Sequence, residues 1–420
     1  MSTESPRSNA PSILNVVVAT PKARGGAIRA GLQFGEHLNR YLPTRTVKMR
    51  GKHDELLVEE LSLSDGITPI PSNTGLRDIC ELAINSDENI CNTFVWTRLN
   101  QPDPLKSYDF VHIHNAVPLW GMVSVALSCK AAGVPYCVTM HGISKIPELP
   151  ESTNMSKPVK FMFENGFLRP YWWVLRNATH LFALSEGDAQ TVRNRFPDQS
   201  VSVLPNGVSP NPPSANAQKT VAQEIDIAAS TPLLLFVGKL IPGKGIEDLL
   251  TAFEQLDHQA RLLIVGPCEN PSYVERIDNN PAADYLGYVD QSRLDSLYQC
   301  ADVFVFPTRS DVFPLVTLEA MAAQTPVITT EVGGLPEQIT EETGILLSPQ
   351  TPTELTNALD ELLNDEQRRI EMGKNAIERV RRQYSWESIA ERAASVYERL
   401  YPELNVTRSN TTDRETESNR

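Results

Sequence analysis

The chain contains 420 residues, of which 41% are hydrophobic, and it carries a formal net charge of −14 at pH 7. A chain of this length exceeds what one hydrophobic core usually supports, so two domains are expected. The acidic balance excludes general nucleic-acid binding, which requires a basic surface.

The cysteines and the first residues indicate the compartment. The cysteines show neither a C-x-x-C pair nor a zinc-site spacing, which predicts buried thiols in a reducing compartment; they are Cys80, Cys91, Cys129, Cys137, Cys268 and Cys300. Residues 1–12 are polar, lack the apolar segment of a secretory signal and are predicted to be disordered. No apolar run is long enough to span a membrane. These features predict a cytoplasmic protein.

Short apolar runs alternate with amphipathic stretches along the chain, which is typical of parallel sheets covered by helices. The clearest predicted strands of the first half are 13–19, 109–114, 136–140, 180–184 and 201–204. Those of the second half are 233–237, 261–265, 303–306 and 327–330. The grouping predicts two sheets.

Prolines and small polar residues after Ser209 predict a linker over residues 209–230. This linker separates a predicted N-terminal domain (13–208) from a predicted C-terminal domain (231–383). Within residues 384–404, the stretch 386–400 carries an apolar stripe at helical spacing, so this helix has to dock on another surface. The polar residues 405–420 predict a disordered tail.

Near the start, the first strand leads through Gly25 and Gly26 into a helix predicted from about Ala27 to Asn39. The residues do not form a G-x-G-x-x-G sequence, so a dinucleotide site is only weakly indicated. Two interpretations stay open, a plain tight turn or a loop whose bare amides approach a ligand.

Three histidines stand at or near strand ends. His112 and His114 share one face of an apolar strand, where structural and metal-binding roles are both conceivable. Because no third ligand is spaced with them, a structural role is favoured. His141 differs, since it ends the strand 136–140 and precedes Gly142. A polar side chain in that position is predicted to point into a cleft beyond the strand ends.

The segment from Lys157 to Arg176 interleaves four basic residues with six aromatic ones. On an otherwise acidic chain, this pattern is compatible with contact at a membrane surface or with binding of an amphiphilic acceptor. Packing of the aromatic rings in the core is the alternative.

Two lysines, Lys239 and Lys244, lie in the loop between the strand 233–237 and the next helix. Gly243 and Gly245 allow the backbone of this loop to bend closely around a ligand. Two lysines in one loop are often only solvated, but their place between a strand and a helix favours a diphosphate.

The stretch from Asp311 to Glu319 places one carboxylate before a predicted helix and a second on it. Pro314 suits the first turn, and the following amides would be left free to bind an anion; they belong to Leu315, Val316 and Thr317. The pattern predicts a site for a polyhydroxylated phosphate ester. The alternative is an ordinary helix with an incidental surface glutamate.

Taken together, these motifs resemble the family-four retaining glycosyltransferases, over about residues 13–400. The most specific parts are residues 237–245 and 311–337. The resemblance implies the GT-B fold, in which two Rossmann-like, doubly wound parallel-sheet α/β domains face a cleft. It also implies that the C-terminal helix crosses back to pack on the N-terminal domain.

The family's acid-x7-acid signature matches Asp311 and Glu319. By resemblance, Glu319 binds the nucleotide ribose and Asp311 the hydroxyls of the transferred sugar. Lys239 and Lys244 neutralise the diphosphate beside Leu315 and Val316. Gly25 and Gly26 face the diphosphate from the first domain, and His141 contacts the sugar near the reacting centre.

We therefore expect this protein to transfer a sugar from a nucleotide-diphosphate sugar, UDP- or GDP-linked, to a hydroxyl of an acceptor. The acceptor is a glycan, a lipid-linked molecule or a small molecule. The expected pathway is cell-surface polysaccharide or glycolipid biosynthesis. Lysines and helix amides can stabilise the leaving diphosphate, so neither a metal nor a cofactor is expected. No carboxylate is placed as a covalent nucleophile, which favours retention by front-face attack. Peripheral contact with the inner face of the plasma membrane is a further expectation.

Two other functions stay open at this point. A non-hydrolysing nucleotide-sugar epimerase would bind the same donor but would need further acid and base residues. A non-catalytic sugar-nucleotide-binding protein would keep the fold without turnover. Two departures from the family pattern bear on this choice: Asp311 replaces the usual glutamate, and Lys239 stands where arginine is common.

Overall fold

The computed structural model of the chain describes residues 12–20, 25–52, 54–64, 66–71, 97, 105–114, 119–142, 160–161, 163–214, 221 and 231–401. Most of the predicted linker, the predicted tail, Cys80 and Cys91 lie outside the described residues. The chain divides into two compact units. The first unit runs to Leu184 and includes Asp188–Leu204 and the chain from Ile389, whereas the second comprises Ser185–Gly187 and Pro205–Ser388.

The first unit contains a sheet of seven parallel strands in the order β3-β2-β1-β4-β5-β6-β7. Val17 at the end of β1 is paired with Lys48 on one side and His114 on the other, so the carboxyl ends of these strands lie level. The strands are β1 (Ile13–Val17), β2 (Thr44–Met49), β3 (Thr68–Ile70), β4 (Phe110–His114), β5 (Tyr136–Met140), β6 (His180–Ala183) and β7 (Val201–Val203).

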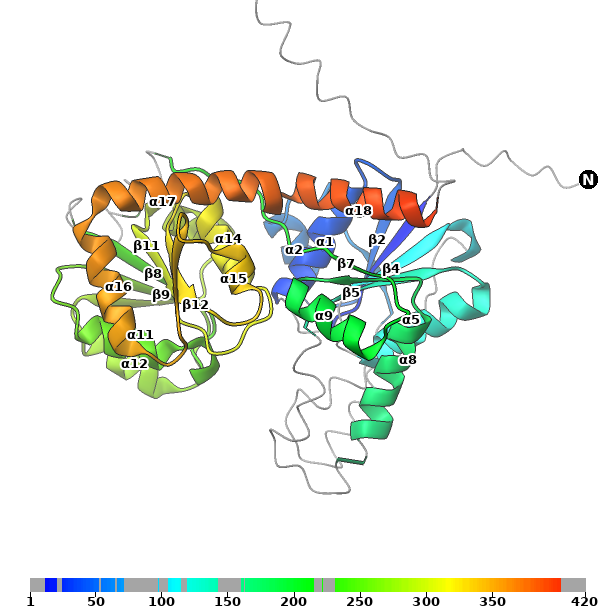
Figure 1. Cartoon of the computed structure of the whole chain (residues 1–420), viewed down its shortest axis with the longest axis horizontal. Coiled ribbons are helices and arrows are strands. Elements are labelled where there is room, and N and C mark those ends of the chain that lie inside the picture. The colour runs from blue at the N-terminus through cyan, green and yellow to red at the C-terminus, as the bar shows by residue number, and fades with distance from the viewer. Residues whose placement is uncertain are drawn as a thin grey trace, which may run out of the picture. The chain divides into compact units, whose positions relative to one another are not determined.

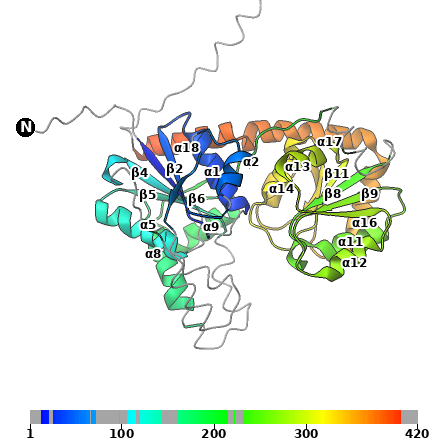
Figure 2. The same ribbon diagram turned by 180° about the vertical axis from the view of Figure 1, so that it is seen from behind.

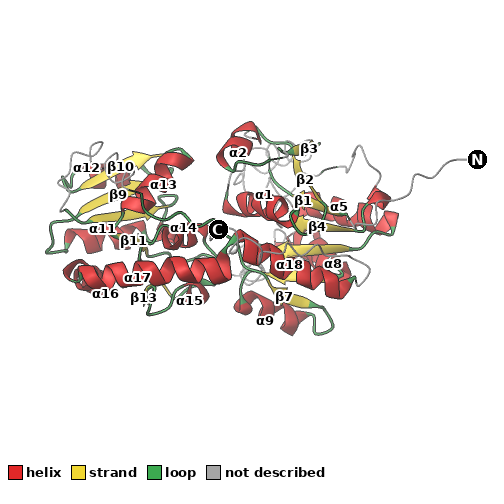
Figure 3. Ribbon diagram, turned by 90° about the horizontal axis from the view of Figure 1, so that it is seen from above, coloured by secondary structure: helices red, strands yellow, loops and turns green. Residues whose placement is uncertain are grey.

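Helices cover both faces of this sheet (Figure 3). One face packs Leu14, Val16, Val111 and Ile113 against α5, α8 and α9. The other face contacts α1, α2 and α18. The helices are α1 (Gly26–Leu38), α2 (Asp54–Glu60), α5 (Leu119–Ala132), α8 (Arg169–Asn177), α9 (Glu186–Arg195) and α18 (Trp386–Leu400), with a short 3₁₀ turn η1 (Leu105–Ser107) and a π-helical turn η3 (Glu164–Leu168).

The C-terminal helix α18 docks on the first sheet, as the sequence predicts. Ile389, Ala393 and Tyr397 of its apolar stripe are buried. The Tyr397 ring lies against Phe110, and its hydroxyl is hydrogen-bonded to Nδ1 of His112 on β4. This contact ties the last helix to the centre of the sheet.

The second unit contains a sheet of six parallel strands in the order β10-β9-β8-β11-β12-β13, again with helices around it (Figures 1 and 2). Its strands are β8 (Leu233–Val237), β9 (Arg261–Val265), β10 (Ala283–Gly287), β11 (Val303–Phe306), β12 (Val327–Thr330) and β13 (Gly344–Leu347). Its helices are α11 (Ile246–Glu254), α12 (Pro271–Asp278), α13 (Gln291–Cys300), α14 (Leu315–Ala322), α15 (Leu335–Gln338), α16 (Pro352–Asn364) and α17 (Glu366–Arg379), with the short turns η4 (Pro242–Lys244) and η5 (Val380–Tyr384).

Both sheets are doubly wound, which confirms the predicted fold class. Strand order reverses between β1 and β4 in the first sheet and between β8 and β11 in the second. In open α/β sheets, such a reversal leaves a crevice beyond the carboxyl ends of the two strands, and ligands bind there. The reversal points therefore mark where sites are expected in each unit.

Histidines form an unusual polar group on the face of the first sheet that contacts α1 and α18. His112, His114 and His180 are almost fully buried. Burial is the main cause that lowers the pKa of His112 to about 3, and neighbouring histidines add to it. Burial, with Arg399 as the second cause, lowers the pKa of His180 to about 4. These rings are neutral at pH 7.

This burial predicts a loss of stability in weak acid. Because the pKa of His180 is near 4 in the folded chain and near 6.5 when exposed, the unfolded chain binds more protons between these values. The free energy of unfolding should fall as pH decreases from about 6.5 to 4, by about 1.4 kcal/mol per pH unit for each such histidine. The free energy of unfolding, measured with urea at several pH values in this range, should fall less steeply with decreasing pH for His180→Gln than for the wild type. An equally steep fall would contradict a buried, neutral His180 in the folded chain.

Candidate functional site

The loop after β8 bends sharply before α11. Gly245 takes a left-handed conformation with φ of +72°, and a Cβ there would lie 1.8 Å from the carbonyl oxygen of Pro307. Only glycine fits this position, because any side chain would collide with the backbone that follows β11. The two loops at the reversal point of the second sheet are thus in direct contact.

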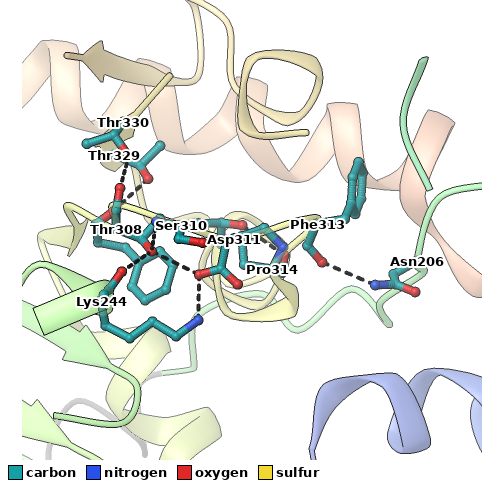
Figure 4. A network of polar contacts seen from close by, with 12 residues as sticks. Asn206, Lys244, Thr308, Ser310, Asp311, Phe313, Pro314, Thr329 and Thr330 are labelled. Atoms are coloured by element: carbon teal, nitrogen blue, oxygen red, sulfur yellow. Dashed lines mark hydrogen bonds and ion pairs between the residues drawn. The ribbon is translucent and has the colours of Figure 1, made fainter. Parts of the chain in front are cut away.

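An ion pair joins these loops (Figure 4). Nζ of Lys244 lies 2.6 Å from Oδ2 of Asp311, with 25% and 17% of the two side chains exposed. The Thr308 hydroxyl donates to the same oxygen at 3.0 Å, and the Lys244 ammonium also lies over the Phe306 ring. Among the described residues, no partner occupies Oδ1 of Asp311. The lysine is therefore held in one place by its counter-ion and by an aromatic face.

Backbone contacts fix the loop that carries Asp311. The amide of Arg309 donates to the carbonyl of Gly243 at 3.0 Å, and the Thr330 hydroxyl on β12 donates to the carbonyl of Thr308. Gly333 has φ of +55°, and a Cβ there would lie 2.1 Å from the carbonyl oxygen of Asp311. Gly333 and the following Gly334 thus allow close packing against the loop that carries Asp311.

Helix α14 begins at Leu315, one residue later than the sequence suggests. Pro314 is its N-cap, with φ of −64° and ψ of 137°, and within the described chain no side chain caps the helix. The Pro314 carbonyl accepts from the Thr317 hydroxyl at 3.0 Å and from Nε2 of Gln338 at 3.1 Å. Leu315 and Val316 are half-buried at this N-terminus. The helix start is thus anchored from behind by a buried polar cluster.

Glu319 lies one turn into α14. The hydroxyl of Tyr298, a side chain on α13 that is only 1% exposed, donates to Oε2 of Glu319 at 2.9 Å. This bond orients a half-buried carboxylate. The sequence alone did not indicate Tyr298, because its hydroxyl reaches Glu319 only through the packing of α13 beside α14.

The two lysines of the β8 loop have different partners. Lys239 pairs with Glu269 at 2.6 Å, and the two side chains are 42% and 69% exposed. Glu269 follows β9 and was not predicted as a site residue. An ion pair this exposed contributes little to stability, so Lys239 remains available to an incoming anion.

The other three predicted site residues belong to the first unit. Gly25 is the N-cap of α1, no side chain of the described residues caps this helix, and Gly25 and Gly26 are exposed. His141 follows β5, and Gly142 after it has φ of +99°. Nε2 of His141 is buried and has no hydrogen-bond partner among the residues that the structure describes. Burial lowers the pKa of His141 to about 4, so the ring is neutral at pH 7.

The geometry combines features suited to a phosphorylated, hydroxyl-bearing ligand. In the second unit, Lys244, Asp311 and the uncapped N-terminus of α14 follow the two strands at the reversal point. Lysines and free helix amides bind anions, and carboxylates accept from hydroxyls.

Known proteins with similar sequences identify the family. A model of glycosyl transferases group 1 matches residues 218–379, and a model of glycosyltransferase family 4 matches residues 93–211. An uncharacterized glycosyltransferase of Methanocaldococcus jannaschii is 34% identical over 305 residues, which cover 69% of this chain and 75% of the relative. The chain belongs to glycosyltransferase family 4.

A further relative of this family 4 glycosyltransferase is the D-inositol 3-phosphate glycosyltransferase of Corynebacterium glutamicum. It is 31% identical over 250 residues, which cover 55% of this chain and 59% of the relative. The match thus spans little more than half the length of that relative.

Solved structures show the GT-B fold. Sucrose-phosphate synthase from Thermosynechococcus elongatus superposes with a TM-score of 0.67 at 23% identity, covering 93% of this chain and 99% of the synthase. Anabaena HepE in complex with UDP gives a TM-score of 0.70 at 18% identity, covering 92% of this chain and all of HepE. At these sequence identities, the similarity to the two solved structures shows a shared fold and nothing further.

The interaction energy between Lys244 and Asp311 can be measured with a double-mutant cycle. We expect Lys244→Met and Asp311→Asn each to lower the free energy of unfolding. The double variant should lose less than the sum of the two single losses, and the difference, the coupling energy, should be about 1 kcal/mol. Urea unfolding of the four proteins measures this coupling. The exposed pair of Lys239 and Glu269 has the same 2.6 Å separation and serves as the control, with Lys239→Met and Glu269→Gln expected to be additive. If both pairs had the same coupling energy, partial burial would not be what strengthens the pair of Lys244 and Asp311.

Proposed function

We propose that this glycosyltransferase moves a sugar from a nucleotide-diphosphate sugar to a hydroxyl of an acceptor with retention of anomeric configuration. The observation that carries the proposal is the contact between Lys244 and Asp311, which stands beside the uncapped start of α14 at the reversal point of the second sheet. The residues place a cation, free amides and a hydroxyl acceptor within two adjoining loops.

In this proposal the second unit holds the donor. Lys239 and Lys244 neutralise the diphosphate together with the amides of Leu315 and Val316. Glu319, oriented by Tyr298, accepts from the ribose hydroxyls. The free Oδ1 of Asp311 is the acceptor for a sugar hydroxyl, because Oδ2 is already taken by Lys244 and Thr308.

The first unit contributes Gly25, Gly26 and His141 to the same reaction. The exposed glycines present bare amides at the start of α1, which suit the diphosphate. The neutral His141 offers either a donor or an acceptor nitrogen to a sugar hydroxyl.

The proposed chemical step breaks the bond between the anomeric carbon and the diphosphate oxygen. The acceptor oxygen bonds to the same carbon from the face that the diphosphate leaves, and its proton passes to the departing phosphate oxygen. The charge that develops on the diphosphate is stabilised by the lysines and helix amides, so the proposal includes neither a metal nor a cofactor.

Relatives support the donor and acceptor classes. HepE has been crystallised with UDP, with UDP and glucose, and with UDP-glucose, which supports a UDP- or GDP-sugar donor. The curated relatives named D-inositol 3-phosphate glycosyltransferase support a hydroxylated small-molecule acceptor. A structural neighbour named as acting in lipopolysaccharide biosynthesis has a TM-score of 0.63, which makes cell-surface polysaccharide or glycolipid synthesis part of the proposal.

Nucleotide binding tests the donor assignment. A thermal-shift screen of UDP, GDP and ADP with their glucose and mannose esters should raise the melting temperature for one base, because a ligand that binds only the folded state stabilises it. Glu319→Ala should weaken the binding of that nucleoside diphosphate about tenfold, through loss of hydrogen bonds to a charged group. Glu361→Ala on α16 is the control. If no nucleotide shifts the melting temperature, the proposal fails.

Turnover separates an enzyme from a binding protein. The wild type should slowly hydrolyse its donor without an acceptor, and Lys244→Ala should reduce this rate at least a hundredfold, because the leaving diphosphate loses a positioned charge. Tight binding without turnover would instead indicate a sugar-nucleotide-binding protein, and sugar inversion without transfer would indicate an epimerase.

We also infer peripheral contact with the inner face of the plasma membrane through the region 157–176, of which the structure describes 160–161 and 163–176. No helix in the described chain is long and apolar enough to cross a membrane. Phe161 is 67% exposed, whereas Trp172 and Trp173 are half-buried against the core and lie under the charges of Arg195 and Lys130. The exposed Phe161 ring, together with the exposed Arg169 and Arg176, suits an anionic lipid surface.

Vesicle binding tests the membrane contact. The wild type should sediment with vesicles containing phosphatidylglycerol more than with pure phosphatidylcholine vesicles, and Phe161→Ser should reduce the bound fraction severalfold. Tyr288→Ser is the matched control, because Tyr288 is 61% exposed but lies in the second unit. Equal losses for both variants, or no binding by the wild type, would exclude the region as a membrane contact.

A further inference from the structure

Within the described part of the chain, the ring of His114 makes no hydrogen bond. His114 ends β4 and is 3% exposed, yet neither Nδ1 nor Nε2 has a partner among the described residues. Its ring stacks on His112 with centroids 4.2 Å apart and lies 6.2 Å from the ring of His141. A buried polar group without a partner costs free energy and is rare in folded proteins, so this ring requires an explanation.

His112, two residues earlier on the same face of β4, shows the contrast. Its Nδ1 is bonded to the Tyr397 hydroxyl and its Nε2 to the Thr139 hydroxyl at 2.6 Å. Its burial is thus compensated and needs no ligand. The structural role that the sequence suggests for both histidines therefore fits His112 and does not account for His114.

The place of His114 in the first sheet bears on its role. It stands at the carboxyl end of β4, beside β1, where the strand order of the first sheet reverses. A Cβ on Gly31 of α1 would lie 3.0 Å from Cβ of His114, so this glycine lets α1 pass directly over the histidine. His141, directly after the neighbouring β5, has a buried Nε2 that likewise meets no partner in the described chain. Of the residues that the structure describes, His114 and His141 thus bring three unpaired ring nitrogens to one edge of the sheet.

We propose that His114 and His141 form a binding site in the first unit for the hydroxyl groups of a sugar or polyol, with any phosphate of that ligand bound elsewhere. This inference rests on the proposed function and adds His114 to it. A neutral imidazole has one donor and one acceptor nitrogen, and a hydroxyl is likewise both donor and acceptor. An anion would not suit this site, because each neutral ring offers it only one donor and burial resists protonation.

The hydroxyls can belong to the transferred sugar or to the acceptor, and binding measurements distinguish the two. Dissociation constants of the wild type and of His114→Phe are measured for two ligands, the nucleoside diphosphate that stabilises the wild type and its sugar ester. In His114→Phe, we expect the affinity for the nucleoside diphosphate to stay within twofold and the affinity for the sugar ester to fall about tenfold, as one or two hydrogen bonds are lost. If the ratio of the two dissociation constants is unchanged but the KM for D-inositol 3-phosphate rises about tenfold, the two histidines bind the acceptor instead.

His112→Phe provides the matched control. It removes two hydrogen bonds and leaves the hydroxyls of Tyr397 and Thr139 unpaired, so its melting temperature should fall while the ratio of dissociation constants stays that of the wild type. His114→Phe removes an unpaired polar ring, so its melting temperature should be equal to or above that of the wild type. A purely structural His114 would not combine retained stability with lost sugar binding.

Imidazole nitrogen-15 spectra give a second measurement that does not depend on a nucleotide. Addition of D-inositol 3-phosphate or of the sugar nucleotide should shift the ring nitrogens of His114, and no such shift should occur for His112. The inference is overturned if neither ligand shifts His114, or if His114→Phe leaves the ratio of dissociation constants and the KM of the acceptor unchanged. A wild type that binds no nucleotide would refute the proposed donor, whereas this spectrum still decides on His114.

Discussion

The reversal of strand order within each parallel sheet is the constraint on which the rest of the structure depends. Where neighbouring strands send their chains to opposite faces, a crevice forms beyond their carboxyl ends, and the loops that border it must pack against one another. In the second unit this is achieved by Gly245, which lets the backbone reach Pro307, and by the ion pair of Lys244 with Asp311. The same constraint that closes the fold thus brings together a cation and a carboxylate.

The sequence indicated the central strands and missed four others. Strands such as β8 and β11 are buried on both faces and read as continuous apolar runs. The missed β2 contains Lys48, which is 1% exposed. Its ammonium pairs with Asp54 at 2.5 Å and donates to the carbonyl of Met49 at 3.0 Å. The missed β10 and β13 form the edges of their sheet, where half-buried residues weaken the apolar pattern. Their strand character depends on neighbours that no local pattern reveals.

The sequence indicated which loops form the candidate site, but it did not indicate which side chains of those loops contact one another. Lys239 and Lys244 are equivalent in the sequence, since both lie between one strand and the next helix. The structure separates them, because the chain places Glu269 beside one and Asp311 beside the other. Tyr298 and Glu269 carried no signal at all, as each reaches the site from another element. Which carboxylate meets which lysine follows from strand order, and spacing along the chain does not contain that order.

Two histidines on one strand of the first sheet differ in whether the protein itself supplies their hydrogen-bond partners. Both His112 and His114 face the same side of β4, and burial keeps both neutral. The energy of burying His112 is offset by two hydroxyl partners inside the protein. The energy of burying His114 is not offset within the described chain. Natural proteins retain such uncompensated groups chiefly where function needs them. A polar ring that weakens the fold at a strand-order reversal is therefore better explained by what it binds than by what it supports.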